Sequence, residues 1–480
     1  MSTSIETVPW RVARQMRAPR RLAQGSFEGA NARFTRQTIA LFLIHAGLGF
    51  AIRASSLIAT AHALATVALV FLAAAKTKSP LRLIPMLAYA AASESLWRLG
   101  EAAVFYELAK YLLAAVSILG VLRFGRSNQG SNIPLVYFLL LVPSILVMPS
   151  INRDEISFNL SGPLSLAMTT FFFGHRAISP GTLRKILVAM MGPIVSFVFI
   201  ATFSTLTTED IDFWSSKVAS AGLGPNQASS LLGMGGLIAF LYLSVLRRQP
   251  VLSWTFAALG VWCSGQAALT FSRGGVATAA GAVAAASFFL ILDRRFRGVV
   301  VLRVVLVVIL ASLFVVPLLD NFTGGDLTKR FSSTHLTGRD KIIKADVIAF
   351  EEHPVLGVGP GQSKPYHALT FRRASTHTEY SRLLAEHGLL GIISLLLLVK
   401  MGFSWLWQPV SLRSKALSAA LITWSLLYMF HAAMRMAIVS FAFALASTIL
   451  VEPPLGPPRR SRAVRGSGPT AARRTADPTS

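Results

Sequence analysis

Residues 299–318 read VVVLRVVLVVILASLFVVPL, an almost uninterrupted apolar run that carries a single charge, Arg303. A helix of about 20 apolar residues spans the hydrocarbon core of a bilayer, so this run predicts a transmembrane helix. The run has no alternation of apolar and polar residues, which excludes a transmembrane β-strand. Similar runs recur along the 480-residue chain, which is 53% hydrophobic and only 14% charged. We therefore predict an all-α protein, a polytopic bundle of transmembrane helices.

Fourteen apolar runs divide the chain into spans and connections. We expect about 12 to 14 of them to cross the membrane, in a bundle over 38–318 and a C-terminal group over 381–451. The runs are 38–52, 55–75, 82–97, 102–122, 133–149, 159–175, 186–205, 227–246, 251–271, 274–292, 299–318, 383–403, 415–431 and 436–451.

Basic residues alternate between the connections. Those after even-numbered runs carry two or three Lys or Arg, whereas the short connections after odd-numbered runs carry about one. Basic residues are retained on the cytoplasmic side of a membrane. The pattern therefore predicts cytoplasmic termini, namely a basic tail at 1–37 and a disordered, Arg- and Pro-rich tail at 452–480. The longest connection, 319–380, falls on the extracytoplasmic side.

The formal net charge of +25 raises the possibility of a nucleic-acid partner. Much of that charge lies in the tails and short connections, where topology determinants belong, so we expect a lipid bilayer as partner and no nucleic acid. The single cysteine, Cys263, excludes an intramolecular disulfide and a cysteine-based zinc site. No pattern of metal ligands and no nucleotide fingerprint is visible, so we expect neither a metal nor another cofactor.

The connection 319–380 has a structure of its own. Loops longer than about 15 residues are usually functional. Thr337 and Asp340 resemble a helix-capping box, and Pro354 marks a helix end. We expect an amphipathic helix between them that lies over the bundle, followed by the glycine-rich GVGPGQ. The apolar residues that recur at roughly helical spacing are Ile342, Ile343, Val347, Ile348 and Phe350.

Three arginines on the predicted outer side are candidates for an anion site. Arg273 lies in SRGG between two apolar runs, and Arg330 and Arg339 lie in the long connection. The guanidinium fork matches phosphate oxygens. The alternatives are an interfacial anchor for Arg273 and solvated helix decoration for the other two. Arg382 and Glu386, four residues apart on a predicted helix, form a structural ion pair in this interpretation.

His377 precedes the last group of apolar runs, in THTEYSRLLAEHGLLG. It is either a structural histidine or a general base, because imidazole titrates near neutral pH. On an unbroken helix, Gly388 and Gly391 would share its face, about 16 and 21 Å deeper. Small residues at that spacing let a neighbouring helix approach closely. We therefore expect these glycines to support the position of His377 through helix packing.

Taken in order, these motifs resemble those of the O-antigen ligase and O-antigen polymerase superfamily of bacterial membrane glycosyltransferases. In the ligase motif, a histidine and then Asn, Ser or Gln precede nine residues and G-x-x-G. Here Thr378 occupies the second place. The motifs that carry the resemblance are PNQASSLL (225–232), SRGG (272–275), TGRDK (337–341), EEHPVLGVGPG (351–361) and the segment from His377 to Gly391.

The resemblance implies an enzyme of the bacterial inner membrane. It would transfer a glycan from undecaprenyl diphosphate to a sugar hydroxyl of another glycan or of lipid A core, with inversion and without a metal. In that reaction His377 would be the catalytic base. Arg273, Arg330 and Arg339 would bind the diphosphate at the extracytoplasmic face. Polymerase, ligase and transfer to protein stay open, and a flippase for the lipid-linked oligosaccharide is the alternative of a different class.

Overall fold

The computed structural model describes residues 24–127, 129–208, 216–246, 249–333, 338–370 and 376–451. Within them the chain is almost entirely helical, and two short strands, β1 (Ala177–Ile178) and β2 (Ile449–Leu450), pair in parallel. The prediction of an all-α, polytopic membrane protein is confirmed. The expected disordered tail at 452–480 and Thr337 of the expected capping box lie outside the described residues.

The helices of the N-terminal half follow the expected apolar runs. They are α2 (Gln24–Ala54), α3 (Ser56–Lys76), η1 (Pro80–Arg82), α4 (Leu83–Leu99), α5 (Leu108–Phe124), α6 (Ile133–Leu139), η2 (Pro143–Val147), α7 (Arg153–Phe173), α8 (Pro180–Leu206) and α9 (Ser216–Ala219).

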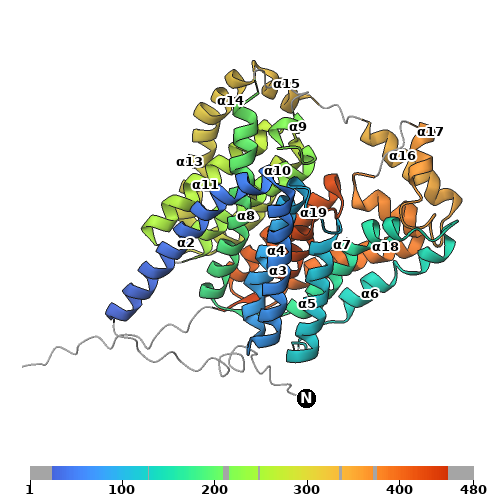
Figure 1. Ribbon diagram of the computed structural model, residues 1–480, viewed down its shortest axis with the longest axis horizontal. Coiled ribbons are helices and arrows are strands. Elements are labelled where there is room, and N and C mark those ends of the chain that lie inside the picture. Colours follow the sequence, from blue (N-terminus) through green and yellow to red (C-terminus); the bar gives the residue numbers. More distant parts are fainter. Residues whose placement is uncertain are drawn as a thin grey trace, which may run out of the picture.

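The helices of the C-terminal half contain the motif residues. They are α10 (Pro225–Val245), α11 (Pro250–Leu269), α12 (Arg273–Leu292), α13 (Arg297–Leu310), η3 (Ala311–Val315), α14 (Val316–Phe322), α15 (Asp326–Ser332), α16 (Arg339–Glu352), α17 (Lys364–Thr370), α18 (Glu379–Leu406), α19 (Leu412–Ala432) and α20 (Ala437–Ala446). In Figure 1, α14 to α17 lie along the upper side of the molecule, above the bundle.

Among the described residues, seven helices are long and apolar enough to cross a membrane by length and composition. Two of the expected spans are not single long helices. The run 133–149 is divided into α6 and η2, where Pro143 starts a new turn, and α20 has only ten residues. At 1.5 Å per residue, each is far shorter than the roughly 30 Å of a bilayer core. At the N-terminus α2 already begins at Gln24, so the expected tail 1–37 is partly helix.

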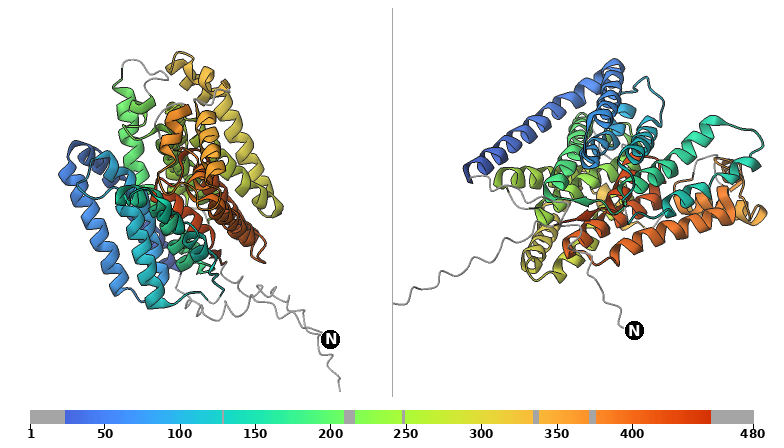
Figure 2. Two further views of the ribbon diagram at one scale, coloured as in Figure 1. Left: turned by 90° about the vertical axis from the view of Figure 1, so that its right-hand side faces the viewer. Right: turned by 90° about the horizontal axis from the view of Figure 1, so that it is seen from below.

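The interior of the bundle is formed by α8 and α10. Within their apolar stretches, 78% of the residues of α8 and 83% of those of α10 are buried. The helical run Arg297–Phe322 is exposed instead, because only 6% of its apolar stretch is buried. The left panel of Figure 2 shows α13 on one flank and the blue helices α2 and α3 on the other. Apolar side chains on such a flank suit a lipid environment. Arg303 is accommodated in α13 because its guanidinium donates to the carbonyl of Leu243 over 2.7 Å.

The amphipathic helix of the long connection is present as α16, with its N-cap at Gly338 in the left-handed region, where φ is 79°. The expected apolar face is wrong, because Ile343, Val347 and Ile348 are exposed. The residues buried beneath the helix are Ile342, Ala345, Asp346 and Ala349. A buried carboxylate on this face needs hydrogen-bond donors, and the structure supplies them at the site described below.

Helix α18 is broken at Gly388, where φ is 59° and ψ is −139°. Its freed backbone groups are paired with the loop that follows Pro354. Leu389 N–H donates to the Pro354 carbonyl over 2.8 Å, and the carbonyl of Ala385 accepts from Val358 N–H over 3.0 Å. In an unbroken helix Leu389 and Ala385 would have bonded to each other. The glycine-rich loop thus replaces one turn of the helix ladder.

The break corrects the expected role of the two glycines. The helix begins at Glu379, so His377 is not on it, and no single face joins His377 to Gly388 and Gly391. A Cβ on Gly388 would lie 2.5 Å from the Pro354 carbonyl oxygen. One on Gly391 would lie 1.9 Å from the carbonyl oxygen of Leu383, in its own helix. The glycines therefore permit the break and the approach of the loop, rather than the approach of a neighbouring helix.

Replacing Gly388 with Ala is expected to lower the free energy of unfolding by at least about 2 kcal/mol. The loss combines an unfavourable backbone conformation with a steric clash. Thermal unfolding of the purified protein in detergent measures it. The control is Gly47→Ala, at a helical glycine where an added Cβ would meet no atom within 4 Å, and there stability should be unchanged or slightly higher. Equal melting temperatures for the two variants would contradict the proposed role of the break.

Candidate functional site

The three predicted arginines come together from three separate elements. Arg273 is the first residue of α12, Arg330 lies in the last turn of α15, and Arg339 is the first residue of α16. Burial lowers the pKa of Arg330 and of Arg339, and the positive charge of Arg273 lowers both further. Arg330 also lowers the pKa of Arg339. Hydrogen bonds place the three close together: Arg330 donates to the carbonyl of Phe271, and Arg339 and Ser272, which adjoins Arg273, share Asn226. Such a cluster of cations favours an anion.

Asn226, in the first turn of α10, ties this arginine cluster to the bundle. Its side-chain oxygen accepts from Arg339 over 3.2 Å and from the hydroxyl of Ser272 over 2.9 Å. Its amide donates to the carbonyl of His431, near the end of α19, over 3.2 Å. One asparagine therefore joins α10, α12, α16 and α19. Because α10 and α12 both start here, the partial positive ends of two helix dipoles add to the charge of the arginines.

The glycines of SRGG allow these helices to approach one another. A Cβ on Gly274 would lie 2.6 Å from the ring of His431, and one on Gly275 would lie 2.2 Å from the Ser229 hydroxyl. The preceding turn contains Phe271 with φ of 55°, a left-handed conformation that is unusual for a residue with a side chain. The Arg330 guanidinium donates to the Phe271 carbonyl over 3.4 Å. Gly275 also lets the backbone of α10 come close, because a Cβ there would lie 2.4 Å from the carbonyl carbon of Ser229.

His377 is half-buried and lies between two anchored threonines. The hydroxyl of Thr378 caps α18 by accepting from Tyr380 N–H over 3.3 Å. Serine and asparagine cap helices in the same way, so Thr378 fills the role open to the residues of the ligase motif. On the other side, the carbonyl of Thr376 accepts from Arg435 over 2.8 Å. The backbone that carries His377 is therefore held on both sides.

Asp346 is the hydrogen-bond acceptor that fixes the side chain of Thr376. This fully buried carboxylate accepts from His367 and from the Ser381 hydroxyl, each over 2.6 Å, and from the Thr376 hydroxyl over 3.3 Å. It thereby joins α16, α17, α18 and the segment before His377. Along α16, Asp346 is seven residues from Arg339, about 10 Å by helical rise. One helix thus connects the arginine cluster with the neighbourhood of His377.

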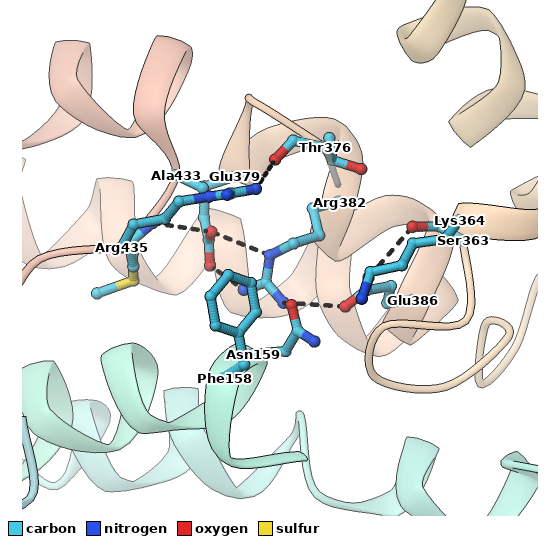
Figure 3. Close-up of a pocket in the computed structure, with 11 residues that line it drawn as sticks. Phe158, Asn159, Ser363, Lys364, Thr376, Glu379, Arg382, Glu386, Ala433 and Arg435 are labelled. Atoms are coloured by element: carbon cyan, nitrogen blue, oxygen red, sulfur yellow. Dashed lines mark hydrogen bonds and ion pairs between the residues drawn. The ribbon is translucent and has the colours of Figure 1, made fainter. Parts of the chain in front are cut away.

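A small open cleft lies next to Thr376, between α7, α18 and the break that separates α19 from α20 (Figure 3). Arg382 forms ion pairs there with Glu379 and, over 2.9 Å, with Glu386, and it donates to Asn159 over 3.3 Å. All three charged groups are buried. The predicted pairing of Arg382 with Glu386 is confirmed, and Glu379 extends it to a triad.

Sequence reasoning identified the arginines but missed the residues that hold the site. Neither Asp346 nor Arg435 was singled out from the sequence. Two features of the sequence could have indicated them. Asp346 lies among the small and apolar residues of its helix, and Arg435 lies between two apolar runs, where a charge is costly. The described residues contain no group of three or more His, Cys, Asp or Glu side chains arranged to hold a metal ion.

Comparison with known proteins addresses this part of the chain. Residues 259–396 match the family model described as O-antigen ligase. This region is similar to O-antigen ligases and is referred to as the matched region. The match supports membership of the chain in the O-antigen ligase and polymerase superfamily, as the motifs predicted. No curated protein matches the chain.

The matched region contains all the predicted site residues: His377, Arg273, Arg330, Arg339, Gly388 and Gly391. Asn226 and the segment 431–435 lie outside it, although both contact it. The family implies two kinds of substrate, a lipid-linked glycan and an acceptor, for a helical protein of the membrane.

The arginines of the matched region should respond differently to loss of charge. Arg382→Gln leaves two buried carboxylates without a cation and should lower the free energy of unfolding by about 3–5 kcal/mol. Arg330→Gln relieves repulsion and should leave stability within about 0.5 kcal/mol or raise it. Thermal unfolding in detergent without substrate compares them. A large loss of stability for Arg330→Gln would mean that this arginine is structural.

Proposed function

We propose that the chain is a glycosyltransferase that moves a glycan from a polyprenyl diphosphate, such as undecaprenyl diphosphate, to an acceptor sugar hydroxyl. The observation that carries this proposal is the convergence of Arg273, Arg330 and Arg339, from three elements, at the start of two helices. Three cations that repel one another bind best to a ligand with several negative charges, such as a diphosphate. The O-antigen ligase match supplies the general reaction.

In the proposed reaction, the acceptor oxygen attacks the anomeric carbon of the donor glycan. The new glycosidic C–O bond forms as the bond from that carbon to the diphosphate oxygen breaks. A single displacement of this kind inverts the anomeric centre. The imidazole of His377 takes the hydroxyl proton, and the polyprenyl diphosphate leaves with the electron pair. Arginines fixed before the reaction stabilise the charge that develops on the leaving group.

Three features of the described residues support this division of roles. The arginine cluster is built from rigid helix ends, so its geometry is preorganised for an anion. His377 lies on backbone that is held by Arg435 on one side and by the cap of α18 on the other. Asp346 and Arg339 lie on the same helix, which fixes the spacing between the anion site and the segment of the base. Positioning of this precision is what a displacement between two bound substrates needs.

The proposal includes the place of the reaction in the cell envelope. In this proposal both termini are cytoplasmic, as the basic residues of the tails favour, and the connection that contains α15, α16 and α17 is extracytoplasmic. A bacterial inner-membrane enzyme in O-antigen or exopolysaccharide assembly would meet its lipid-linked donor there. The acceptor is then a growing glycan for a polymerase, or lipid A core for a ligase.

His377→Ala is expected to lower kcat by about 10²- to 10⁴-fold, because it removes the base while leaving the arginine cluster intact. Transfer from a purified polyprenyl diphosphate glycan, with the enzyme in proteoliposomes, measures it. His353→Ala, at an exposed histidine of the same connection, is the matched control and should retain activity. Unimpaired transfer by His377→Ala would remove His377 from the mechanism. Donor movement between leaflets without transfer by the wild type would instead support a flippase.

Replacing Arg273 or Arg330 with Lys tests the anion site. Lysine keeps the charge but lacks the planar fork, so donor KM should rise or kcat fall by about tenfold. This loss is smaller than the roughly 10²- to 10³-fold cost of deleting an oxyanion donor. Steady-state kinetics with varied donor concentration measure the effect, and Arg153→Lys, at an exposed arginine, is the control. Kinetics equal to those of the control would place the diphosphate elsewhere.

A further inference from the structure

The break between α19 and α20 is a short, strained connection in the middle of the candidate site. Helix α19 ends at Ala432, α20 begins at Ala437, and between them Ala433 has φ of 50°. A residue with a side chain in this conformation costs of order 1–3 kcal/mol and persists only where its surroundings hold it. Close packing contributes here, since a Cβ on Gly162 of α7 would lie 2.7 Å from the Met434 carbonyl oxygen.

Polar contacts on both sides of the break connect it with the site. Near the end of α19, the carbonyl of His431 accepts from Asn226, which also binds Arg339. Within the break, the N–H of Met434 donates to Glu379, in the first turn of α18, over 3.3 Å. The break therefore touches the arginine cluster at one end and the helix that follows His377 at the other.

Arg435 completes the connection. Its guanidinium donates to the Thr376 carbonyl over 2.8 Å and lies 5.2 Å from the centre of the Phe158 ring. Figure 3 shows it reaching from the break towards Thr376. Among the described residues, no carboxylate oxygen lies within 4 Å of this guanidinium, although burial lowers its pKa. The hydrogen bond to the Thr376 carbonyl, next to His377, is therefore the main polar contact of this guanidinium.

We propose that Arg435 is a positioning residue for the transfer reaction. It holds the peptide between Thr376 and His377, so that the imidazole keeps a fixed place relative to the arginine cluster. The chain of contacts runs from Arg339 through Asn226 to the His431 carbonyl, along the break to Arg435, and on to Thr376. A second route runs along α16 to Asp346 and the Thr376 side chain. This inference rests on the proposed role of His377 as the base.

The two routes have different effects on the peptide. Asp346 binds the side chain of Thr376, which leaves the orientation of the following peptide free to change. Arg435 binds the carbonyl of that peptide itself. Without this bond the peptide can rotate and move the imidazole, whereas the arginine cluster keeps its own contacts. A misplacement of about 1 Å can lower a rate by about 10²-fold. Loss of Arg435 should therefore act on kcat and spare donor binding.

The test compares Arg435→Gln and Arg435→Lys with Arg303→Gln in proteoliposomes. Arg303 is a matched control because its guanidinium also donates to a backbone carbonyl, that of Leu243, away from the site. Arg435→Gln should lower kcat per folded enzyme by about 10- to 100-fold, with donor KM changed less than about twofold. Arg435→Lys, which keeps one donor, should recover part of kcat. Arg303→Gln should change stability but not kcat.

Three outcomes would overturn the inference. One is a wild-type kcat for Arg435→Gln. Another is an equal loss of kcat in Arg303→Gln, which would indicate a general structural effect. The third is a rise in donor KM without a fall in kcat, which would make Arg435 a donor ligand. If Arg435→Gln does not fold, the kcat and KM of Arg435→Lys decide between these results. Failure of the proposed function is distinguishable, because it would appear as full activity of His377→Ala.

Discussion

The site depends on a backbone exchange between the broken helix α18 and the loop after Pro354. At the break, Leu389 N–H and the Ala385 carbonyl lose each other as partners and gain partners in the loop. Unpaired backbone groups in a buried place cost about as much as a lost hydrogen bond, so break and loop are stable only together. The exchange fixes the long connection to the bundle on the C-terminal side of α16. It lies directly after α16, which contacts the site through Arg339 and Asp346.

The exchange also accounts for the glycines of two motifs, the GVGPGQ loop and the segment around Gly388, because each must let the other come close. A Cβ on Gly357 of the loop would lie 2.4 Å from the peptide between Glu386 and His387, and one on Gly388 would strike the loop in return. Glu386 adds a side-chain bond, because its carboxylate accepts from the Ser363 hydroxyl over 3.2 Å. The glycine-rich loop therefore needs no nucleotide to account for its composition. Its glycines allow it to pack against the backbone of α18.

The sequence was sufficient for the helical class, which depends on local composition. It also singled out the three arginines and His377 as candidates, because a single residue type carries their chemistry. It was insufficient for the break in α18, since a glycine in an apolar run permits either close helix packing or a change of backbone direction. The buried face of α16 was mispredicted for a related reason. Apolar periodicity places Val347 inside, but three hydrogen bonds to Asp346 turn that neighbouring residue inward instead. Such partners lie far apart in sequence and only the fold brings them together.

The arginines of this site divide into two kinds that composition alone does not separate. Arg382 is buried between two carboxylates, so its charge is compensated before any ligand arrives. The cluster of Arg273, Arg330 and Arg339 lies on other helix ends, and the charge of Arg273 lowers the pKa of Arg330 and of Arg339. If the arginines of the cluster could reach the carboxylates of the triad, they would form ion pairs with them. The positive charge of the cluster would then be neutralised, and an anion would gain little by binding. The fixed distance that α16 imposes between Arg339 and the segment of His377 thus serves two purposes. It preserves the positive potential for an anionic substrate, and it places that potential at a constant distance from the group proposed to accept the proton.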